Sequence, residues 1–86
     1  MSRNEILKTI RGFFKGTVTI AEFSKSRLFN GCDIVLNASK LKNLITQEDL
    51  EDVIFENFVK LFPNHYHLSV QVFEHSDIQV YIDFEN

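Results

Sequence analysis

Apolar residues recur at helical spacing in two stretches of the chain, and each stretch begins with residue types that favour a helix N-terminus. In the first stretch the recurring residues are Ile6, Leu7, Ile10, Phe13 and Phe14. Ser2 precedes them, with Glu5 three residues further on, which is the pattern of a capping box. Gly16 follows and readily adopts the left-handed conformation that ends a helix. The pattern predicts a helix over about residues 3–15.

The second stretch, about residues 47–62, predicts the longest helix of the chain. Thr46 is its expected N-cap, and the acidic residues after it suit the positive end of the helix dipole. One face of this helix carries Leu50, Val53, Ile54, Asn57, Phe58 and Leu61. Pro63 ends it, because the residue before a proline is disfavoured in the helical conformation.

The segment between residues 17 and 29 fits two different structures. Its first residues, 17–20, are all β-branched and favour a strand. However, Thr19 and Glu22 are spaced as a second capping box, and Ile20, Phe23 and Leu28 fit a helical stripe. We therefore predict a short helix over about residues 20–29, with a strand as the alternative.

The C-terminal part of the chain alternates with period two, which is typical of strands. The alternating apolar residues are Tyr66, Leu68, Val70 and Val72, then Ile78, Val80, Ile82 and Phe84. The polar residues 74–77 separate the two runs, so the pattern predicts a β-hairpin. A two-stranded hairpin is marginal alone in water and needs a helix or a third strand. The segment around Ile34 is a candidate third strand.

These elements predict one α+β domain that spans residues 1–86. In this prediction two helices come first, the long helix is the third, and an antiparallel hairpin forms the C-terminus. The sequence shows no internal repeat.

Charge is divided unevenly along the chain, although the formal net charge is only −3. Residues 1–45 contain eight Lys or Arg and three acids, whereas residues 46–86 contain one Lys and nine acids. This division creates an electrical dipole if the two halves occupy different faces, and an acidic face would steer a basic partner. Charge preferences at helix ends produce a similar bias without any function.

The long predicted helix carries the candidate binding residues. On a second side of it, Phe55, Val59 and Phe62 fall beside Glu48, Glu51 and Asp52. Either this helix is buried on two sides, or it exposes an aromatic patch ringed by carboxylates, as tight protein interfaces do. We predict a contact surface formed by Glu48, Glu51, Asp52, Phe55 and Glu56, with Asp77, Asp83 and Glu85 as secondary charges.

Candidate catalytic and metal-binding residues are few. Cys32 is the only cysteine, so no internal disulfide forms, and no catalytic motif surrounds it. His65 and His67 have the spacing of metal ligands on one face of a strand, but a third ligand is missing. We expect no enzymatic activity, no metal and no cofactor.

Composition also indicates which classes of partner and which cell compartment are expected. The lysines and arginines are dispersed and the isoelectric point is near 5.5, which argues against direct nucleic-acid binding. No segment has the apolar length of a membrane span or of a signal peptide. We therefore expect a cytoplasmic protein without membrane contact, either a monomer or a homodimer.

Residues 5–8 (EILK) and 13–23 (FFKGTVTIAEF) carry a resemblance to a known family. They are similar to the start of bacterial toxin-immunity proteins of the colicin D immunity type, in which Glu-Phe lies in a second helix. The resemblance covers less than a third of the chain, and the predicted hairpin departs from that helical family. It is thus a resemblance to the broad class of small acidic immunity proteins, including those of contact-dependent inhibition systems. It implies a cognate toxin, often a nuclease, and carries over no individual binding residue.

The charge division, the acidic helix side and the resemblance together predict a stoichiometric protein inhibitor that neutralises a basic bacterial toxin. One alternative is a phage or plasmid-encoded acidic inhibitor that mimics nucleic acid. Another is a small structural subunit that pairs through the edge of its hairpin.

Overall fold

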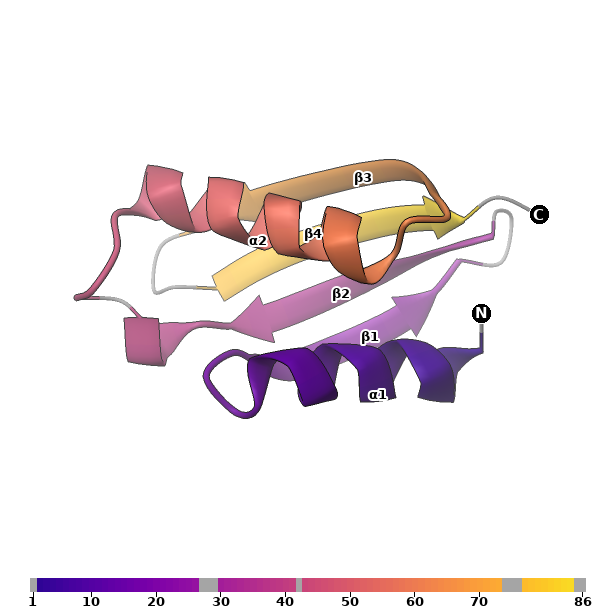
Figure 1. Cartoon of the computed structure of the whole chain (residues 1–86), viewed down its shortest axis with the longest axis horizontal. Helices are drawn as coiled ribbons and strands as arrows, with labels where there is room; N and C mark the ends of the chain where they lie inside the picture. The colour runs from indigo at the N-terminus through magenta and orange to yellow at the C-terminus, as the bar shows by residue number, and fades with distance from the viewer. Residues whose placement is uncertain (1, 27–29, 42, 74–76, 85–86) are drawn as a thin grey trace.

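The computed structural model of the chain describes residues 2–26, 30–41, 43–73 and 77–84, which form two helices over a four-stranded sheet (Figure 1). In chain order the elements are α1 (Arg3–Phe14), β1 (Thr19–Lys25), β2 (Gly31–Asn37), the 3-10 turn η1 (Ser39–Leu41), α2 (Gln47–Leu61), β3 (His65–Val72) and β4 (Asp77–Phe84). Both α-helices lie on the same face of the sheet, side by side and running in opposite directions.

The caps predicted from the sequence define both helices. The Ser2 side chain accepts a hydrogen bond of 3.2 Å from the Glu5 N–H, and Thr46 accepts one of 3.1 Å from the Asp49 N–H. After α1, Lys15 and Gly16 have positive φ values of 49° and 87°, which turn the chain out of the helix. The predicted helices over residues 3–15 and 47–62 are confirmed.

The sheet is antiparallel throughout, in the order β1-β2-β4-β3. The order of elements repeats, because α1 is followed by the hairpin β1–β2 and α2 by the hairpin β3–β4. The second strands of the two hairpins, β2 and β4, pair at the centre, which leaves β1 and β3 as the edges. The fold therefore contains a repeat that the sequence does not display.

The predicted order of elements is wrong, although the α+β class holds. The segment around Ile34 is the central strand β2, and the predicted helix over residues 20–29 is replaced by β1; residues 27–29 lie outside the described residues. The cause is a β-bulge between Ile20 and Glu22. Ile20 pairs with Leu36 and Phe23 with Ile34, so the bulge puts residues three apart on one face, which mimics helical spacing.

The core lies between the two helices and the face of the sheet that they cover. Buried apolar side chains come from both helices and from strands β2, β3 and β4. A row of phenylalanine rings joins these layers, with centroid distances of 6.5 Å for Phe14–Phe58, 5.7 Å for Phe58–Phe62 and 5.7 Å for Phe62–Phe84. Three of these four rings belong to α2, to the residue that caps it, or to β4.

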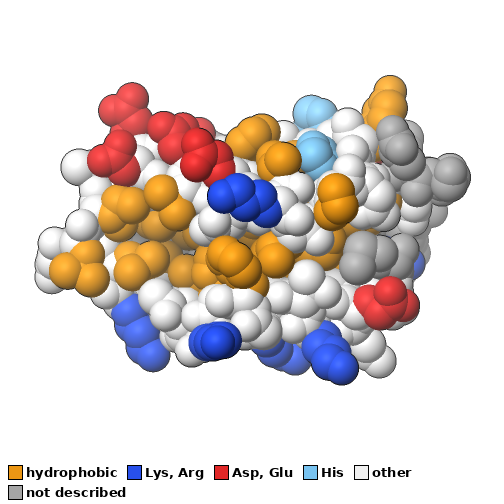
Figure 2. All heavy atoms as spheres, in the orientation of Figure 1, with side chains coloured by type: hydrophobic (Ala, Val, Ile, Leu, Met, Phe, Trp, Pro, Cys, Tyr) orange, Lys and Arg blue, Asp and Glu red, His pale blue; other side chains and the backbone are white. Residues whose placement is uncertain are grey.

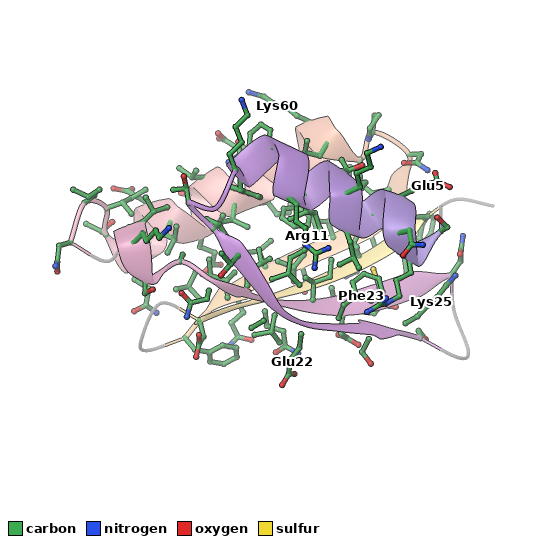
Figure 3. All side chains as sticks on the ribbon, turned by 90° about the horizontal axis from the view of Figure 1, so that it is seen from below. Glu5, Arg11, Glu22, Phe23, Lys25 and Lys60 are labelled. Atoms are coloured by element: carbon green, nitrogen blue, oxygen red, sulfur yellow. The ribbon has the colours of Figure 1, made fainter. Side chains whose placement is uncertain are left out.

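The other face of the sheet carries no helix, as the view from below shows (Figure 3). Glu22 points away from α1 on this face. Strand β4 alternates between the faces: Ile78, Val80 and Ile82 are buried, whereas Asp77 and Gln79 are exposed. One packed face and one solvated face is the usual arrangement of an antiparallel sheet.

Candidate functional site

The predicted contact residues on the long helix share the solvent-exposed surface of α2. Figure 2 shows acidic side chains gathered over the first part of α2, at the margin of the molecule above the apolar band between the helices. We call Glu48, Glu51, Asp52, Phe55 and Glu56 the α2 acidic surface; all five are exposed. Among the described residues, no lysine or arginine forms an ion pair with its carboxylates. These charges are therefore available to a partner.

The aromatic residues beside these carboxylates separate into exposed and buried ones. Phe55 is 42% exposed, Val59 is half-buried and Phe62 is completely buried. Both alternatives from the sequence thus hold in part, because Phe62 packs in the core and Phe55 faces solvent. An exposed phenylalanine among carboxylates gives the α2 acidic surface apolar area to bury as well as charge.

The predicted secondary charges do not join this surface. Asp77 lies on the solvated face of β4, and so does Asp83, because it alternates with the buried Ile82 and Phe84. That face is on the opposite side of the sheet from α2. Glu85 lies outside the described residues. The acids of the second half therefore occupy two separate surfaces rather than one patch.

The solvated sheet face carries a polar cluster, Asp33, His67, Tyr81 and Asp83, that the sequence alone does not reveal. The Tyr81 hydroxyl donates a hydrogen bond of 2.8 Å to Asp83 Oδ1, and this bond is the main reason that the pKa of Tyr81 is raised. The centroids of the His67 and Tyr81 rings lie 6.1 Å apart. Asp33 of β2 pairs with Tyr81 across the sheet. Only the register of β2 and β3 against β4 brings these residues together. Gly31 of β2 lies opposite Asp83 and leaves room for its carboxylate.

The candidate thiol chemistry is not supported by the geometry. Cys32 is 1% exposed, and its burial in the core is the main cause that raises the pKa of its thiol to about 11. A thiol with such a pKa stays protonated near neutral pH and is a poor nucleophile.

The two spaced histidines do not share a face. A bulge lies between them, so His65 pairs with Phe84 on the core side and His67 with Asp83 on the solvated side. His65 instead places Nδ1 2.8 Å from the Phe62 carbonyl oxygen. Within the residues described, no group of three or more metal-binding side chains forms.

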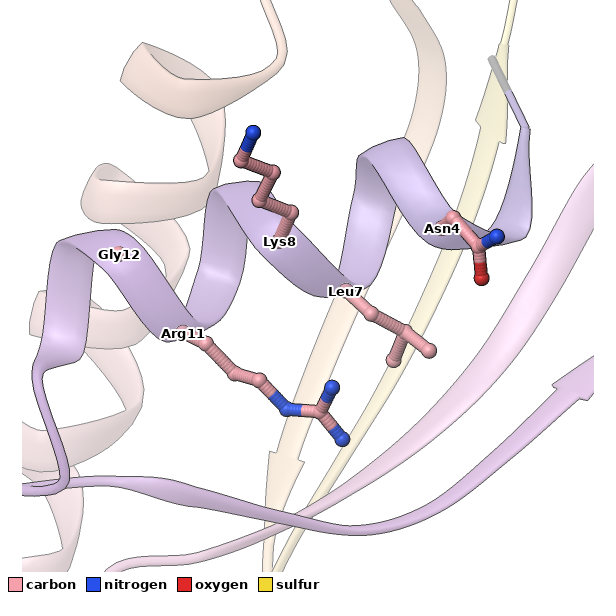
Figure 4. Close-up of a pocket in the computed structure, with 5 residues that line it drawn as sticks. All are labelled: Asn4, Leu7, Lys8, Arg11 and Gly12. Carbon is pink, nitrogen blue, oxygen red and sulfur yellow. The ribbon is translucent and has the colours of Figure 1, made fainter.

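A shallow hollow on the surface of α1 is lined by Asn4, Leu7, Lys8, Arg11 and Gly12 (Figure 4). Leu7 and Arg11 point toward β1, whereas Lys8 points away from it. All the lining residues belong to one helix, so the hollow lacks the second wall that encloses a small-molecule ligand.

No helix in the described ranges has the length and apolar character needed to cross a membrane. Comparisons with protein-family models, with curated proteins and with solved structures find no match for this chain. Functional inference therefore rests on the surfaces described above.

Proposed function

We propose that the chain is a stoichiometric inhibitor that binds a basic protein, a bacterial toxin of the nuclease kind, through the α2 acidic surface. The observation that carries this proposal is the cluster of four carboxylates around the exposed Phe55, with no ion pair to a base in the described part of the chain. The resemblance of residues 5–23 supports it less, because their Glu-Phe pair lies in β1 rather than in a second helix.

The charges and the phenylalanine contribute differently to such binding. Single exposed ion pairs contribute at most about 1 kcal/mol, so the carboxylates mainly raise the association rate and select basic partners. Burying the exposed part of Phe55 supplies apolar contact energy that salt does not screen. Binding should therefore weaken at high salt without being abolished.

A nuclease is the partner class that fits this surface best. Enzymes that hold a phosphodiester backbone present lysines and arginines to it, and carboxylates of an inhibitor can occupy the positions of the phosphates. Blocking that surface would stop the enzyme without any catalysis by the inhibitor.

The test compares two charge-reversed variants of equal net charge. Glu51→Lys with Asp52→Lys reverses the α2 acidic surface, whereas Glu22→Lys with Asp77→Lys makes the same change in charge on the solvated sheet face. Partners are captured from the native host with wild-type protein, and the purified partner is then titrated with each variant. We expect at least about a tenfold loss of affinity for the α2 variant only, or about 1.4 kcal/mol. Equal affinity for both folded variants would remove α2 from the interface.

A further inference from the structure

The two edges of the sheet differ in how they are protected against pairing with another strand. Edge strand β1 has a bulge near its middle and carries Glu22 and Lys25. The Arg3 guanidinium of α1 lies 5.5 Å from the centre of the Phe23 ring of β1. Bulges and charged side chains are the devices that keep natural edge strands from adding further strands.

Edge strand β3 lacks these devices over most of its length. The eight residues His65–Val72 include no Lys, Arg, Asp, Glu or Pro. Its bulge lies at its beginning, between His65 and His67, so the pairing from His67 to Val72 is regular. A long, regular and uncharged edge is a template for another strand.

The hydrogen bonds of β3 show which of its backbone groups face outward. The Phe73 N–H donates to the Asp77 carbonyl at 2.8 Å, and pairs of this type alternate along an antiparallel ladder. Gln71 and Ser69 therefore bond to β4, whereas the N–H and C=O of Val70 and Leu68 point away from it. Val72 confirms the alternation, because its outward carbonyl accepts a hydrogen bond of 2.9 Å from Gln47 Nε2. Within the described ranges, no side chain or loop bonds to the outward groups of Leu68 and Val70.

This open edge lies at the same margin of the molecule as the α2 acidic surface. Helix α2 packs directly on β3, and Gln47 ties the start of the helix to the end of the strand. In Figure 1, α2 and β3 form the upper margin of the molecule, and Figure 2 shows the acidic side chains at the left end of that margin, over the first part of α2, which lies near the end of β3. A strand added to β3 would therefore run beside the carboxylates of α2.

We propose that β3 accepts a β-strand from the basic partner, which pairs with the backbone of Leu68 and Val70 while its cationic side chains meet the α2 acidic surface. This proposal rests on the proposed function and names its mode of binding. Main-chain hydrogen bonds supply affinity in strand addition, and side chains supply specificity. Side chains on one side of the added strand face α2, so alternate positions should be basic or apolar; the others continue the polar sheet face beside Ser69 and Gln71.

Charge favours this occupant over a second copy of the chain. Pairing two copies through β3 would place two α2 acidic surfaces on one side of a joined sheet, and each copy has a formal net charge of −3. Like charges at an interface oppose association, whereas a lysine-rich or arginine-rich strand is attracted. The acids thus allow the edge to remain open to a basic strand while disfavouring self-pairing.

The test uses a synthetic peptide in which lysine and valine alternate, titrated by fluorescence anisotropy. Val70→Pro removes the outward N–H of Val70 without removing a bond to β4, and a proline is tolerated at such an edge position. Val70→Ala is the matched control, because it loses the same side-chain packing but keeps the N–H. We expect the proline variant to bind at least about tenfold more weakly than the alanine variant. A peptide with glutamate in place of lysine should not bind.

Equal binding by the two Val70 variants, or no saturable binding to the wild type, would overturn strand addition. Loss of binding in the Glu51→Lys, Asp52→Lys variant together with equal binding by the Val70 variants would reject the strand and leave the acidic surface as the binding site. If the proline variant does not fold, amide hydrogen exchange of the wild-type protein, with and without the peptide, tests strand addition instead. The amides of Leu68 and Val70 must then become protected when the peptide binds, and unchanged exchange overturns the proposal.

Discussion

The two halves of the molecule, α1-β1-β2 and α2-β3-β4, use the same order of elements to make different surfaces. Residues 1–45 carry eight bases and three acids, and their edge strand β1 is charged and has a bulge near its middle. Residues 46–86 carry one base and nine acids, and their edge strand β3 is uncharged and pairs regularly from His67 to Val72. Both halves bury an apolar stripe of the helix and one face of the hairpin. The same fold is thus compatible with very different exposed residues, so the exposed positions of each half can differ in charge and in edge structure.

Both halves supply buried apolar residues, but the aromatic rings of the core are divided unequally between them. In the row of phenylalanine rings, Phe58, Phe62 and Phe84 come from the second half and Phe14 from the first. On the edge strand of the first half, β1, the one phenylalanine, Phe23, is only partly buried against the core. The half that we propose to bind a partner thus also supplies most of the aromatic rings of the core.

The largest expected effect tests this inequality. Phe58→Ala should lower the free energy of unfolding by about 3–5 kcal/mol, because it removes the fully buried ring that contacts both Phe14 and Phe62. Phe23→Ala, the matched change in the first half, should cost about 1–2 kcal/mol because the ring is partly exposed. Urea denaturation measures both. Equal losses would mean that the two halves share the core evenly.

Two glycines of the first half should respond in opposite directions to alanine. Gly31 faces β4 at the junction of the halves, where an added Cβ would collide with Asp83 Oδ1 and lie 3.0 Å from the Ile82 carbonyl oxygen. Gly31→Ala should therefore lower the free energy of unfolding by about 1–3 kcal/mol. Gly12 lies in α1 with nothing within 4 Å of an added Cβ, so Gly12→Ala should stabilise the protein by about 1 kcal/mol. Stabilisation by both substitutions, measured in urea, would show that β2 and β4 do not approach closely at Gly31.

The bulges at the two edges explain what the sequence predicts and what it does not. The helices were predictable because caps and spacing act within one element: Ser2 and Thr46 begin them as expected. A bulge changes which residues share a face, and it depends on the neighbouring strand. In β1 it makes Ile20 and Phe23 neighbours on one face, which favoured a helix; in β3 it separates His65 from His67.

The same distinction applies to the candidate site: residues of a single element were predictable, whereas those brought together by strand pairing were not. Glu48, Glu51, Asp52, Phe55 and Glu56 follow from the geometry of a single helix, and all lie exposed on α2. The Tyr81–Asp83 pair and its neighbours His67 and Asp33 depend on the pairing of three strands. Likewise, the open edge of β3 follows only from the strand order, because a hairpin alone does not show which of its strands lies at the edge.

The smallest expected effect concerns the Tyr81–Asp83 hydrogen bond, which lies where β4 meets the first half. This bond holds the proton on the phenol and raises the pKa of Tyr81, so its stabilising effect is complete below about pH 10, the usual pKa of tyrosine. It is lost as the pH rises through the raised pKa of the folded protein. The chain has two tyrosines, so Tyr66→Phe leaves Tyr81 as the only one, and its ionisation can be followed by ultraviolet absorption.

In that background, Asp83→Asn removes the negative acceptor, and Tyr81 should ionise at lower pH than in the parent because phenolate no longer forms beside a carboxylate. Asp77→Asn, on the same face of β4 but without a bond to Tyr81, is the control with equal change in charge and should leave the titration nearly unchanged. Identical shifts in both variants would mean that Tyr81 senses only the general negative field of the second half. A shift confined to Asp83→Asn would mean that the hydrogen bond within β4 sets the ionisation of Tyr81.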